Sequence, residues 1–372
     1  MGVNVSVILP CRDEERTLAG CIRQIKKSLD RERLDYEIIV SDSSTDSSPE
    51  IAKRHGVKLV RHNKKGYGIA IIEAMHKAKG TYIVIGDADG TYDFSEIPLL
   101  IEQLDYGHDL VIGSRLKGNI KKGAMPWHHK YIGNPLLSFL LNVFFRTKVS
   151  DAHSGFRAIR KDYLFFLNLK TTGMEFASEM IIKAAKNNLD ITEVPITYSP
   201  RIGESKLKSF SDGWRHLRFM LMFSPTYLFF IPGLLLLLSG FFILGAMMAG
   251  TLFISGQDVS IYMSLLGSSF SVLGYQLMNL GLYSKIYAIH TGFEKEDKLI
   301  DFIAKKVPLE RGIILGLGLV VLGLAGFFLF FQRLFTTLNT AWILFILSVF
   351  IIGVQTVFSV FFISMMLVEK RD

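Results

Sequence analysis

The sequence is poor in cysteine, poor in charge and lacks a long apolar run near its start. Only two of its 372 residues are cysteines, Cys11 and Cys21, which excludes a disulfide-stabilised scaffold. Charged residues make up only 20% of the chain and hydrophobic residues 49%, which excludes intrinsic disorder. The first apolar run, residues 3–9, is too short for a secretory signal. We therefore expect the amino-terminal half to stay in the cytosol.

Charge is distributed unevenly along the chain. Residues 1–222 contain 33 Lys and Arg against 26 Asp and Glu, whereas residues 223–372 contain 9 against 8. The excess of cations therefore belongs to the half that also carries most of the polar residues. This distribution predicts anionic substrates and an anionic membrane surface as partners, and no nucleic acid.

In the first half of the chain, segments typical of strands alternate with segments typical of helices. Expected strands are 3–9, 36–40, 57–61, 82–85 and 110–112, and expected helices are 14–29, 47–55, 68–79 and 97–106. This alternation predicts an α/β domain with a Rossmann-like, mostly parallel sheet. Because ligands bind at the carboxyl ends of the strands in such sheets, we expect the functional residues there.

The second half of the chain contains four long apolar runs. They cover approximately residues 227–248, 261–289, 313–331 and 342–368, each long enough to cross about 30 Å of hydrocarbon. The connection 294–311 carries five Lys and Arg residues, and the other two connections carry one between them. The positive-inside rule then predicts a multi-pass, all-α membrane domain whose middle connection and both termini are cytoplasmic.

Two segments next to the apolar runs mix aromatic and basic residues. Segments 126–148 and 206–223 have this composition, which predicts amphipathic helices lying on the membrane; the alternative is helices of the soluble core. The expected organisation is a cytosolic domain over 1–205, an interfacial helix over 206–223 and a transmembrane domain over 224–372.

Acidic residues follow two of the expected strands. Asp87 and Asp89 come directly after the fourth strand, where two hard-oxygen donors suit Mg²⁺ or Mn²⁺ on a diphosphate; the alternative is an acidic turn. Asp42 ends the second strand, where it is expected to accept a hydrogen bond from a nucleobase. The alternative role of helix cap suits Asp46 better.

Two other strand ends carry residues that suit the approach of a nucleotide. Pro10 and Glu14 follow the first strand. Gly66 and Gly68 follow the third strand, where glycine permits close backbone approach to a nucleotide sugar and a helix amino terminus favours phosphate. Four strand ends thus offer complementary parts of one binding site.

The order of these motifs resembles family 2 glycosyltransferases with the GT-A fold, and among them the polyprenyl-phosphate (dolichol-phosphate) glucose and mannose synthases. The motifs that carry the resemblance are Val7–Pro10, Asp42, Gly66–Gly68, Asp87–Asp89, Gly113–Arg115, Asp151–Arg157, Glu175–Met180 and Arg201–Leu207. The resemblance implies inverting transfer of one hexose, from UDP-glucose or GDP-mannose, to a polyprenyl or dolichyl phosphate at the cytosolic membrane face.

The resemblance also implies roles for individual residues. Substrate-binding residues would be Pro10, Glu14, Asp42, Gly66, Gly68, Asp87, Lys130, Glu175, Glu179, Arg201, Ser205 and Lys206. Asp87 and Asp89 would hold the metal, with His153 either a third ligand or a neutral hydrogen-bonding residue. Arg115 would face the acceptor phosphate. Asp151 would be either a general base or a structural brace, and Asp89, Arg115 and Asp151 form the expected catalytic set.

Other functions stay open at this point. The Gln-x-x-Arg-Trp run of processive polymer synthases is missing, which disfavours polymer synthesis. One alternative is transfer to another lipid acceptor, such as diacylglycerol. A second is a non-catalytic nucleotide-sugar-binding module on a lipid transport protein, and a homo-oligomer is compatible with each.

Overall fold

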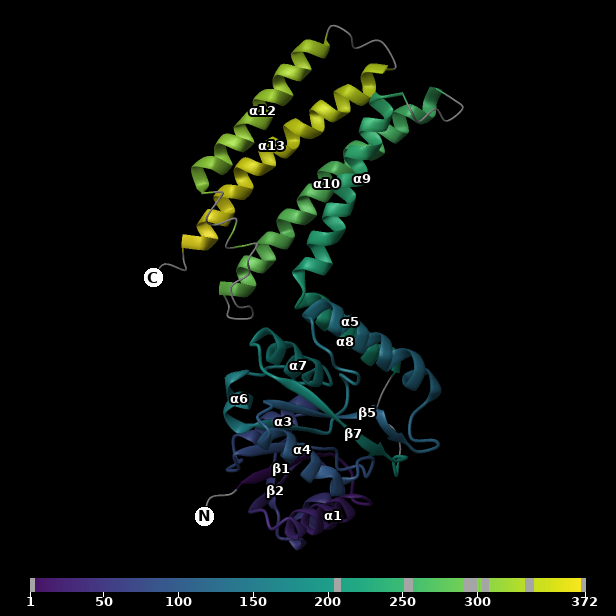
Figure 1. The fold of residues 1–372 in the computed structure, drawn as a ribbon, viewed down its shortest axis with the longest axis vertical. Helices are drawn as coiled ribbons and strands as arrows, with labels where there is room; N and C mark the ends of the chain where they lie inside the picture. Colours follow the sequence, from purple (N-terminus) through teal and green to yellow (C-terminus); the bar gives the residue numbers. More distant parts are fainter. Residues whose placement is uncertain are drawn as a thin grey trace. The chain divides into compact units, whose positions relative to one another are not determined.

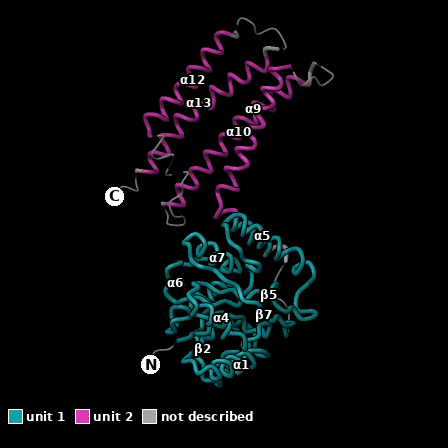
Figure 2. Tube along the Cα trace, viewed as in Figure 1, with its two compact units in different colours: residues 1–220 teal, residues 221–372 magenta. Residues whose placement is uncertain are grey.

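The computed structural model describes residues 4–203, 209–250, 257–290, 300, 302, 308–331 and 338–368. The chain divides into two compact units, residues 1–220 and residues 221–372 (Figure 2). The first unit is an α/β domain that contains the sheet, and the second is built from long helices (Figure 1).

The first unit is organised around a seven-stranded sheet with the order β3-β2-β1-β4-β6-β5-β7. Its strands are β1 (Val5–Cys11), β2 (Tyr36–Asp42), β3 (Lys58–Arg61), β4 (Tyr82–Ile85), β5 (Leu110–Ile120), β6 (Arg157–Arg160) and β7 (Ile191–Tyr198). Only β6 is antiparallel to its neighbours, β4 and β5. The expected mostly parallel, GT-A type of sheet is therefore confirmed.

The strand directions bring the polar motifs to one edge. The other pairs, β1–β2, β1–β4, β2–β3 and β5–β7, are parallel. Because β6 runs against β4 and β5, its first residue lies where those two strands run toward their carboxyl ends. The residues after β1, β2 and β4, the distal part of β5 and the loop before β6 therefore share this edge.

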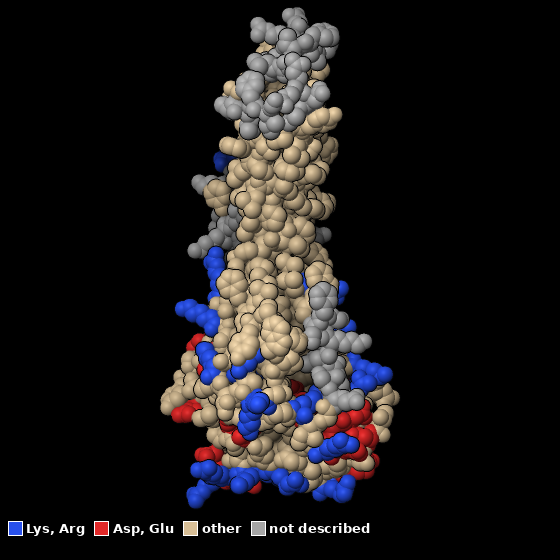
Figure 3. Space-filling view, turned by 90° about the vertical axis from the view of Figure 1, so that its right-hand side faces the viewer, with Lys and Arg blue, Asp and Glu red and all other residues tan. Residues whose placement is uncertain are grey.

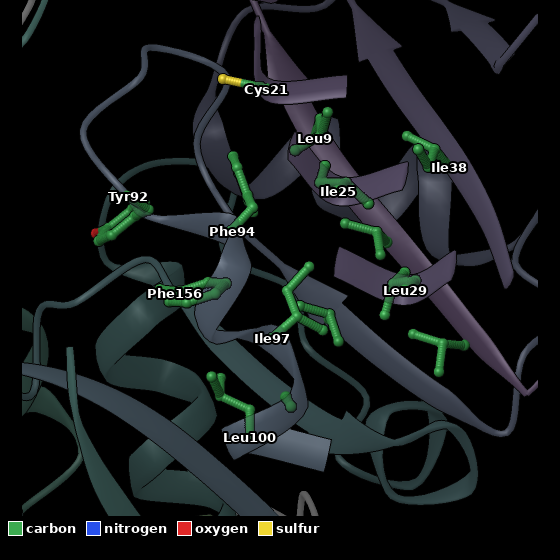
Figure 4. Close-up of a cluster of buried hydrophobic side chains, with 14 of the residues drawn as sticks. Leu9, Cys21, Ile25, Leu29, Ile38, Tyr92, Phe94, Ile97, Leu100 and Phe156 are labelled. Atoms are coloured by element: carbon green, nitrogen blue, oxygen red, sulfur yellow. The ribbon is translucent and has the colours of Figure 1, made fainter. Parts of the chain in front are cut away.

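Helices cover the sheet and complete its core. The helices are α1 (Leu18–Arg31), α2 (Ser48–Arg54), α3 (Tyr67–Met75), α4 (Ile97–Asp105), α5 (Asn134–Phe145), α6 (Lys161–Phe166), α7 (Phe176–Lys186) and α8 (Ser209–Met222). Alternate residues of β1, such as Leu9, pack in one buried cluster with Ile25 of α1 and Leu100 of α4 (Figure 4). Phe94 and Phe156 fill this cluster near the carboxyl edge of β4.

The predicted interfacial segment 126–148 forms a short π-helical turn, His129–Gly133, followed by α5. Four of its apolar side chains are exposed at helical spacing, Ile132, Leu136, Phe139 and Val143, whereas Leu141 of α5 is buried. An exposed apolar face is what binding to a membrane surface requires. That binding stays a prediction. The segment 206–223 contains α8, whose His216 and Met220 are buried in unit 1, and residues 206–208 lie outside the described part of the chain.

The described residues of the second unit form four long helices. They are α9 (Ile231–Met248), α10 (Gln257–His290), α12 (Leu309–Phe331) and α13 (Leu338–Val368). α9 packs along α10, and α12 packs along α13. Their surface is almost free of charged side chains on the face seen in Figure 3.

Three of these helical segments have the length and apolar composition of membrane spans: Thr226–Met248, Leu309–Leu329 and Thr340–Leu367. The segment 261–289, expected as a fourth span, lies within α10, which is long enough but less apolar because Ser, Gln, Asn and Lys285 interrupt it. Within the described residues the structure thus supports three apolar spans where we expected four, and the number of passes and the cytoplasmic orientation stay predictions. The basic connection on which that orientation rests lies mostly outside the described residues.

Glycines allow α9 and α10 to approach closely. A Cβ at Gly240 would lie 2.4 Å from the backbone nitrogen of Ser271, and a Cβ at Gly274 would lie 2.3 Å from that of Leu237. Both distances are too short for carbon, so the two backbones meet where only glycine fits.

We expect Gly240→Ala to destabilise this helix pair by about 2 kcal/mol, because the methyl group must push the two backbones apart. Gly245→Ala on the same helix is the matched control, since nothing lies within 4 Å of its added carbon. Thermal denaturation of both variants in detergent tests this. Equal melting temperatures would contradict the close contact.

Candidate active site

An arginine joins two acids at the carboxyl edge of the sheet. Asp89 follows β4, and its Oδ1 accepts hydrogen bonds from the backbone N–H and the hydroxyl of Thr91, at 3.1 and 2.6 Å. Its Oδ2 lies 3.2 Å from Nη1 of Arg201. Nη2 of the same arginine pairs with Oε1 of Glu14, which follows β1. Three expected site residues are therefore brought together.

Asp87 lies next to this group, and the pKa of its carboxyl group is shifted. Burial, and then the charge of Asp89, raise the pKa of Asp87 to about 7, although Arg115 and Arg201 act in the opposite direction. Two carboxylates that repel each other in a desolvated place are stabilised by a cation. Their oxygens are the donors that Mg²⁺ or Mn²⁺ prefers, so this pair fits a divalent metal.

Asp42, at the end of β2, is a buried acid with unused hydrogen-bonding capacity. It is 0% exposed, and neither of its carboxylate oxygens accepts a hydrogen bond within the described part of the chain. Nε of Arg61, its register partner on β3, lies 3.6 Å from Oδ2. Pro10 lies on the neighbouring strand β1. Asp46, the expected cap, lies one residue before the start of the cap of α2: Ser47 is the N-cap residue, and Oδ1 of Asp46 accepts from the backbone N–H of Ser48.

Asp151 is engaged by Arg115. The guanidinium donates Nε–H to Oδ2 at 2.7 Å and Nη2–H to Oδ1 at 2.8 Å, and the Arg115 backbone N–H adds a third bond. Burial by itself would raise the pKa of Asp151, but the charge and hydrogen bonds of Arg115 outweigh it and lower that pKa. A carboxylate held so firmly is a poor proton acceptor. This geometry favours the brace over the general base, with Arg115 as the braced group.

His153 lies in the loop before β6 but is not gathered with the acids. No group of three or more His, Cys, Asp or Glu side chains suited to a metal occurs among the residues that the structure describes. The His153 ring packs edge-on against His216 of α8, with ring centroids 4.3 Å apart. Burial, His216 and two nearby arginines lower its pKa well below the ordinary value, so the ring is neutral. Both ring nitrogens are buried without a hydrogen-bond partner among the described residues, so the choice between a metal ligand and a neutral hydrogen-bonding residue stays a prediction.

The two glycines at the start of α3 serve packing. A Cβ at Gly66 would lie 2.2 Å from the carbonyl oxygen of Thr172, and one at Gly68 would lie 2.1 Å from that of Thr171. Glu179 holds the same loop from α7, because its carboxylate accepts the backbone N–H groups of Lys170 and Thr171 at 2.8–3.0 Å. Lys183 neutralises Glu179 at 2.8 Å.

The remaining expected residues are placed differently. Oε2 of Glu175 is buried without a hydrogen-bond partner in the described chain, so this carboxylate keeps its capacity for a ligand. Lys130 lies on the turn before α5, with its ammonium 5.3 Å from the ring centroid of Tyr131. Ser205 and Lys206 lie outside the described residues.

Two supporting residues on β7 escaped the sequence analysis. Oε1 of Glu193 accepts hydrogen bonds from the backbone N–H groups of Ser150 and Asp151, at 2.9 and 3.0 Å. The ring of Tyr198 lies 5.2 Å below the Arg115 guanidinium. Glu193 could have been found from the sequence, because it is an acidic residue within a segment that is otherwise typical of a strand.

We expect Glu179→Gln to destabilise the first unit by about 2 kcal/mol, because it weakens the bonds to the 170–171 loop and removes the negative charge that lies 2.8 Å from the Lys183 ammonium. Glu73→Gln provides the control, since Glu73 makes an exposed pair with Lys64. Thermal unfolding followed by circular dichroism measures both. If Glu179→Gln and Glu73→Gln had equal melting temperatures, this would contradict the role of Glu179 in holding the 170–171 loop.

Comparison with known proteins identifies the family. Residues 6–165 match the family model described as glycosyl transferase family 2, and residues 282–367 match the glycosyltransferase family 2 C-terminal transmembrane region. The chain is 42% identical over 322 residues to the low-salt glycan biosynthesis hexosyltransferase Agl6 of Haloferax volcanii, covering 86% of this chain and 78% of the relative.

Two further comparisons extend over the first unit. A dolichyl-phosphate hexose transferase of the same organism is 30% identical, covering 56% of this chain and 89% of the relative. The crystal structure of glucosyl-3-phosphoglycerate synthase from Mycobacterium tuberculosis with Mn²⁺, UDP-glucose and phosphoglyceric acid has a TM-score of 0.48 at 23% identity, covering 59% of this chain and 78% of that one. The chain therefore belongs to glycosyltransferase family 2 and is a glycosyltransferase that carries the C-terminal transmembrane region of that family.

Proposed function

We propose that this glycosyltransferase transfers a single hexose from a nucleotide sugar to a polyprenyl or dolichyl phosphate, with inversion at the anomeric carbon. The observation that carries the proposal is the arrangement of Glu14, Asp87, Asp89 and Arg201 at the carboxyl edge of the sheet, with Asp42 two strands away from β4 on the same edge. The names of the relatives, a hexosyltransferase and a dolichyl-phosphate hexose transferase, support the same chemistry.

The acidic half of the site suits the donor. Asp42 has two buried, unused acceptor oxygens that suit the N–H groups of a nucleobase. Asp87 and Asp89 would hold Mg²⁺ or Mn²⁺, and the cation when bound would neutralise the diphosphate leaving group. Because two side chains supply fewer oxygens than such a cation requires, its shell needs further oxygens such as those of a diphosphate. UDP-glucose and GDP-mannose both fit this description.

The basic half of the site suits the acceptor. A phosphomonoester is mostly a dianion near neutral pH, since its second pKa is about 6. It can attack the anomeric carbon without a general base, and this agrees with the engagement of Asp151 by Arg115. Arg115 supplies a fixed positive charge, and Lys130 a second on an exposed turn. These groups orient and screen two anionic reactants.

The membrane half of the proposal rests on unit 2 and on α5. The three apolar spans make the chain an integral membrane protein, and the exposed apolar face of α5 is suited to the lipid surface from which a polyprenyl phosphate is taken. We place the catalytic domain and both termini on the cytoplasmic side, because the basic connection 294–311 predicts this orientation.

The test uses purified full-length protein in detergent with Mg²⁺ or Mn²⁺. Radiolabelled UDP-glucose, GDP-mannose and UDP-N-acetylglucosamine are offered separately, each with a polyprenyl phosphate or with diacylglycerol, and the lipid is extracted. We expect label in an acid-labile lipid from one donor, only with the phosphate acceptor and abolished by EDTA. Label in diacylglycerol would show that the acceptor is another lipid, and no labelled lipid from folded protein would overturn both the proposed donors and the proposed acceptor.

A further inference from the structure

Arg201 occupies the centre of the acidic site. Its guanidinium contacts Asp89 through Nη1, at 3.2 Å, and Glu14 through Nη2. The three side chains are largely buried, with 23% of Arg201, 11% of Asp89 and 10% of Glu14 exposed. One cation therefore neutralises two acids that reach the site from the ends of β1 and β4.

The atom that Arg201 contacts is the one a metal would need. Oδ1 of Asp89 already accepts two hydrogen bonds from Thr91, so Oδ2 is the oxygen left for a further cation. That oxygen is in contact with the guanidinium. Two cations at contact distance from one carboxylate oxygen repel each other, so a divalent metal and Arg201 compete for it.

We propose that Arg201 is the resident counter-ion of this site and that a divalent cation displaces it from Asp89 only when a diphosphate enters as well. This inference rests on the proposed function, which supplies the diphosphate. The diphosphate gives the displaced guanidinium a new anionic partner, in the bidentate geometry that arginine favours. Metal alone must instead break the Arg201–Asp89 ion pair without giving Arg201 a new anionic partner. Binding of metal and of nucleotide is therefore positively coupled.

The experiment measures Mn²⁺ affinity directly, by the electron paramagnetic resonance signal of free Mn²⁺, on EDTA-treated full-length protein in detergent. For the wild type, saturating UDP or GDP is expected to lower the Mn²⁺ dissociation constant at least about tenfold. Without nucleotide, Arg201→Met is expected to bind Mn²⁺ about tenfold more tightly than the wild type, because the competing cation is gone. Arg201→Lys keeps the charge but cannot contact both acids, so its Mn²⁺ affinity is expected to lie between those of the wild type and Arg201→Met.

Lys121→Met is the matched control for net charge, because Lys121 is an exposed cation of the same unit. Its Mn²⁺ affinity is expected to stay within about twofold of the wild type. Arg201→Met binding no more tightly than Lys121→Met would overturn the inference. If Arg201→Met does not fold, Arg201→Lys equal to the wild type would overturn it too. A gain in Arg201→Met with no effect of UDP or GDP on the wild type would keep the counter-ion assignment but overturn the coupled displacement and, with it, the proposed donor.

Discussion

Replacing Asp89 by asparagine is expected to lower the turnover of sugar transfer on the order of 10³-fold. The change removes the charge at Oδ2, the oxygen that contacts Arg201 and that we propose holds a divalent cation on the diphosphate. Loss of leaving-group stabilisation acts on the transition state, so kcat is expected to fall more than KM rises. The amide keeps the shape of the side chain and one oxygen for Thr91.

The control for this prediction is Asp93→Asn in the same loop. Oδ1 of Asp93 accepts the backbone N–H and the hydroxyl of Ser95, at 3.0 and 2.6 Å, so that carboxylate serves local structure. Transfer of radiolabelled hexose to polyprenyl phosphate is measured for both variants. Asp89→Asn retaining more than about a tenth of the wild-type rate would show that Asp89 does not hold a metal essential to transfer.

Replacing Asp151 by asparagine is expected to destabilise the first unit by about 3–5 kcal/mol, because it leaves the Arg115 guanidinium buried without its counter-charge. Arg115 is 8% exposed and Asp151 is fully buried, so water does not compensate the loss. The double variant Arg115→Met with Asp151→Leu removes both charges and is expected to recover a large part of the stability. Denaturant unfolding of the wild type, Arg115→Met, Asp151→Leu and the double variant gives the coupling free energy of the pair.

The pH dependence distinguishes this brace from a general base. The folded pKa of Asp151 is lower than its ordinary value of 3.8. The stability that the pair contributes is therefore complete above that ordinary value and is lost as pH falls through the lower folded value. Between pH 5 and pH 9 we expect no change in transfer rate attributable to this carboxyl. An Asp151→Asn variant as stable as the wild type but inactive would contradict the brace and restore the general base.

The fold could be predicted where the evidence is local. Alternating apolar segments located β1 to β5, and the long apolar runs located the helices of unit 2. Helix α1 begins at Leu18, four residues later than expected, because the backbone N–H groups of Thr17 and Leu18 both bond to the carbonyl of Glu14 in a preceding turn. The segment 261–289 stays a prediction as a span, because its polar residues are spread among large apolar ones and lower its mean hydropathy.

The site could be predicted as a set of residues but not as a set of contacts. Glu14 and Arg201 are 187 residues apart in the sequence, and Arg115 and Asp151 are 36 apart. No local pattern indicates which cation pairs with which acid, because that depends on sheet order and on the antiparallel insertion of β6. Gly66 and Gly68 show the same limit, since the loop that excludes a side chain there is about 100 residues away.

The insertion of β6 between β4 and β5 has an evolutionary consequence. Glu14, Asp42, Asp87 and Asp89 all belong to the segment that ends with β4 and its loop, whereas Arg115, Asp151 and Glu193 belong to the segment that follows. The two segments meet at the carboxyl edge of the sheet, where Arg201 of the second segment contacts Asp89 of the first. Under the proposed function, substitutions in one segment are expected to change the recognition of one reactant and to leave in place the residues that the other segment supplies. Chimaeras that exchange one of these two segments between relatives are expected to change the recognition of one reactant in the same way.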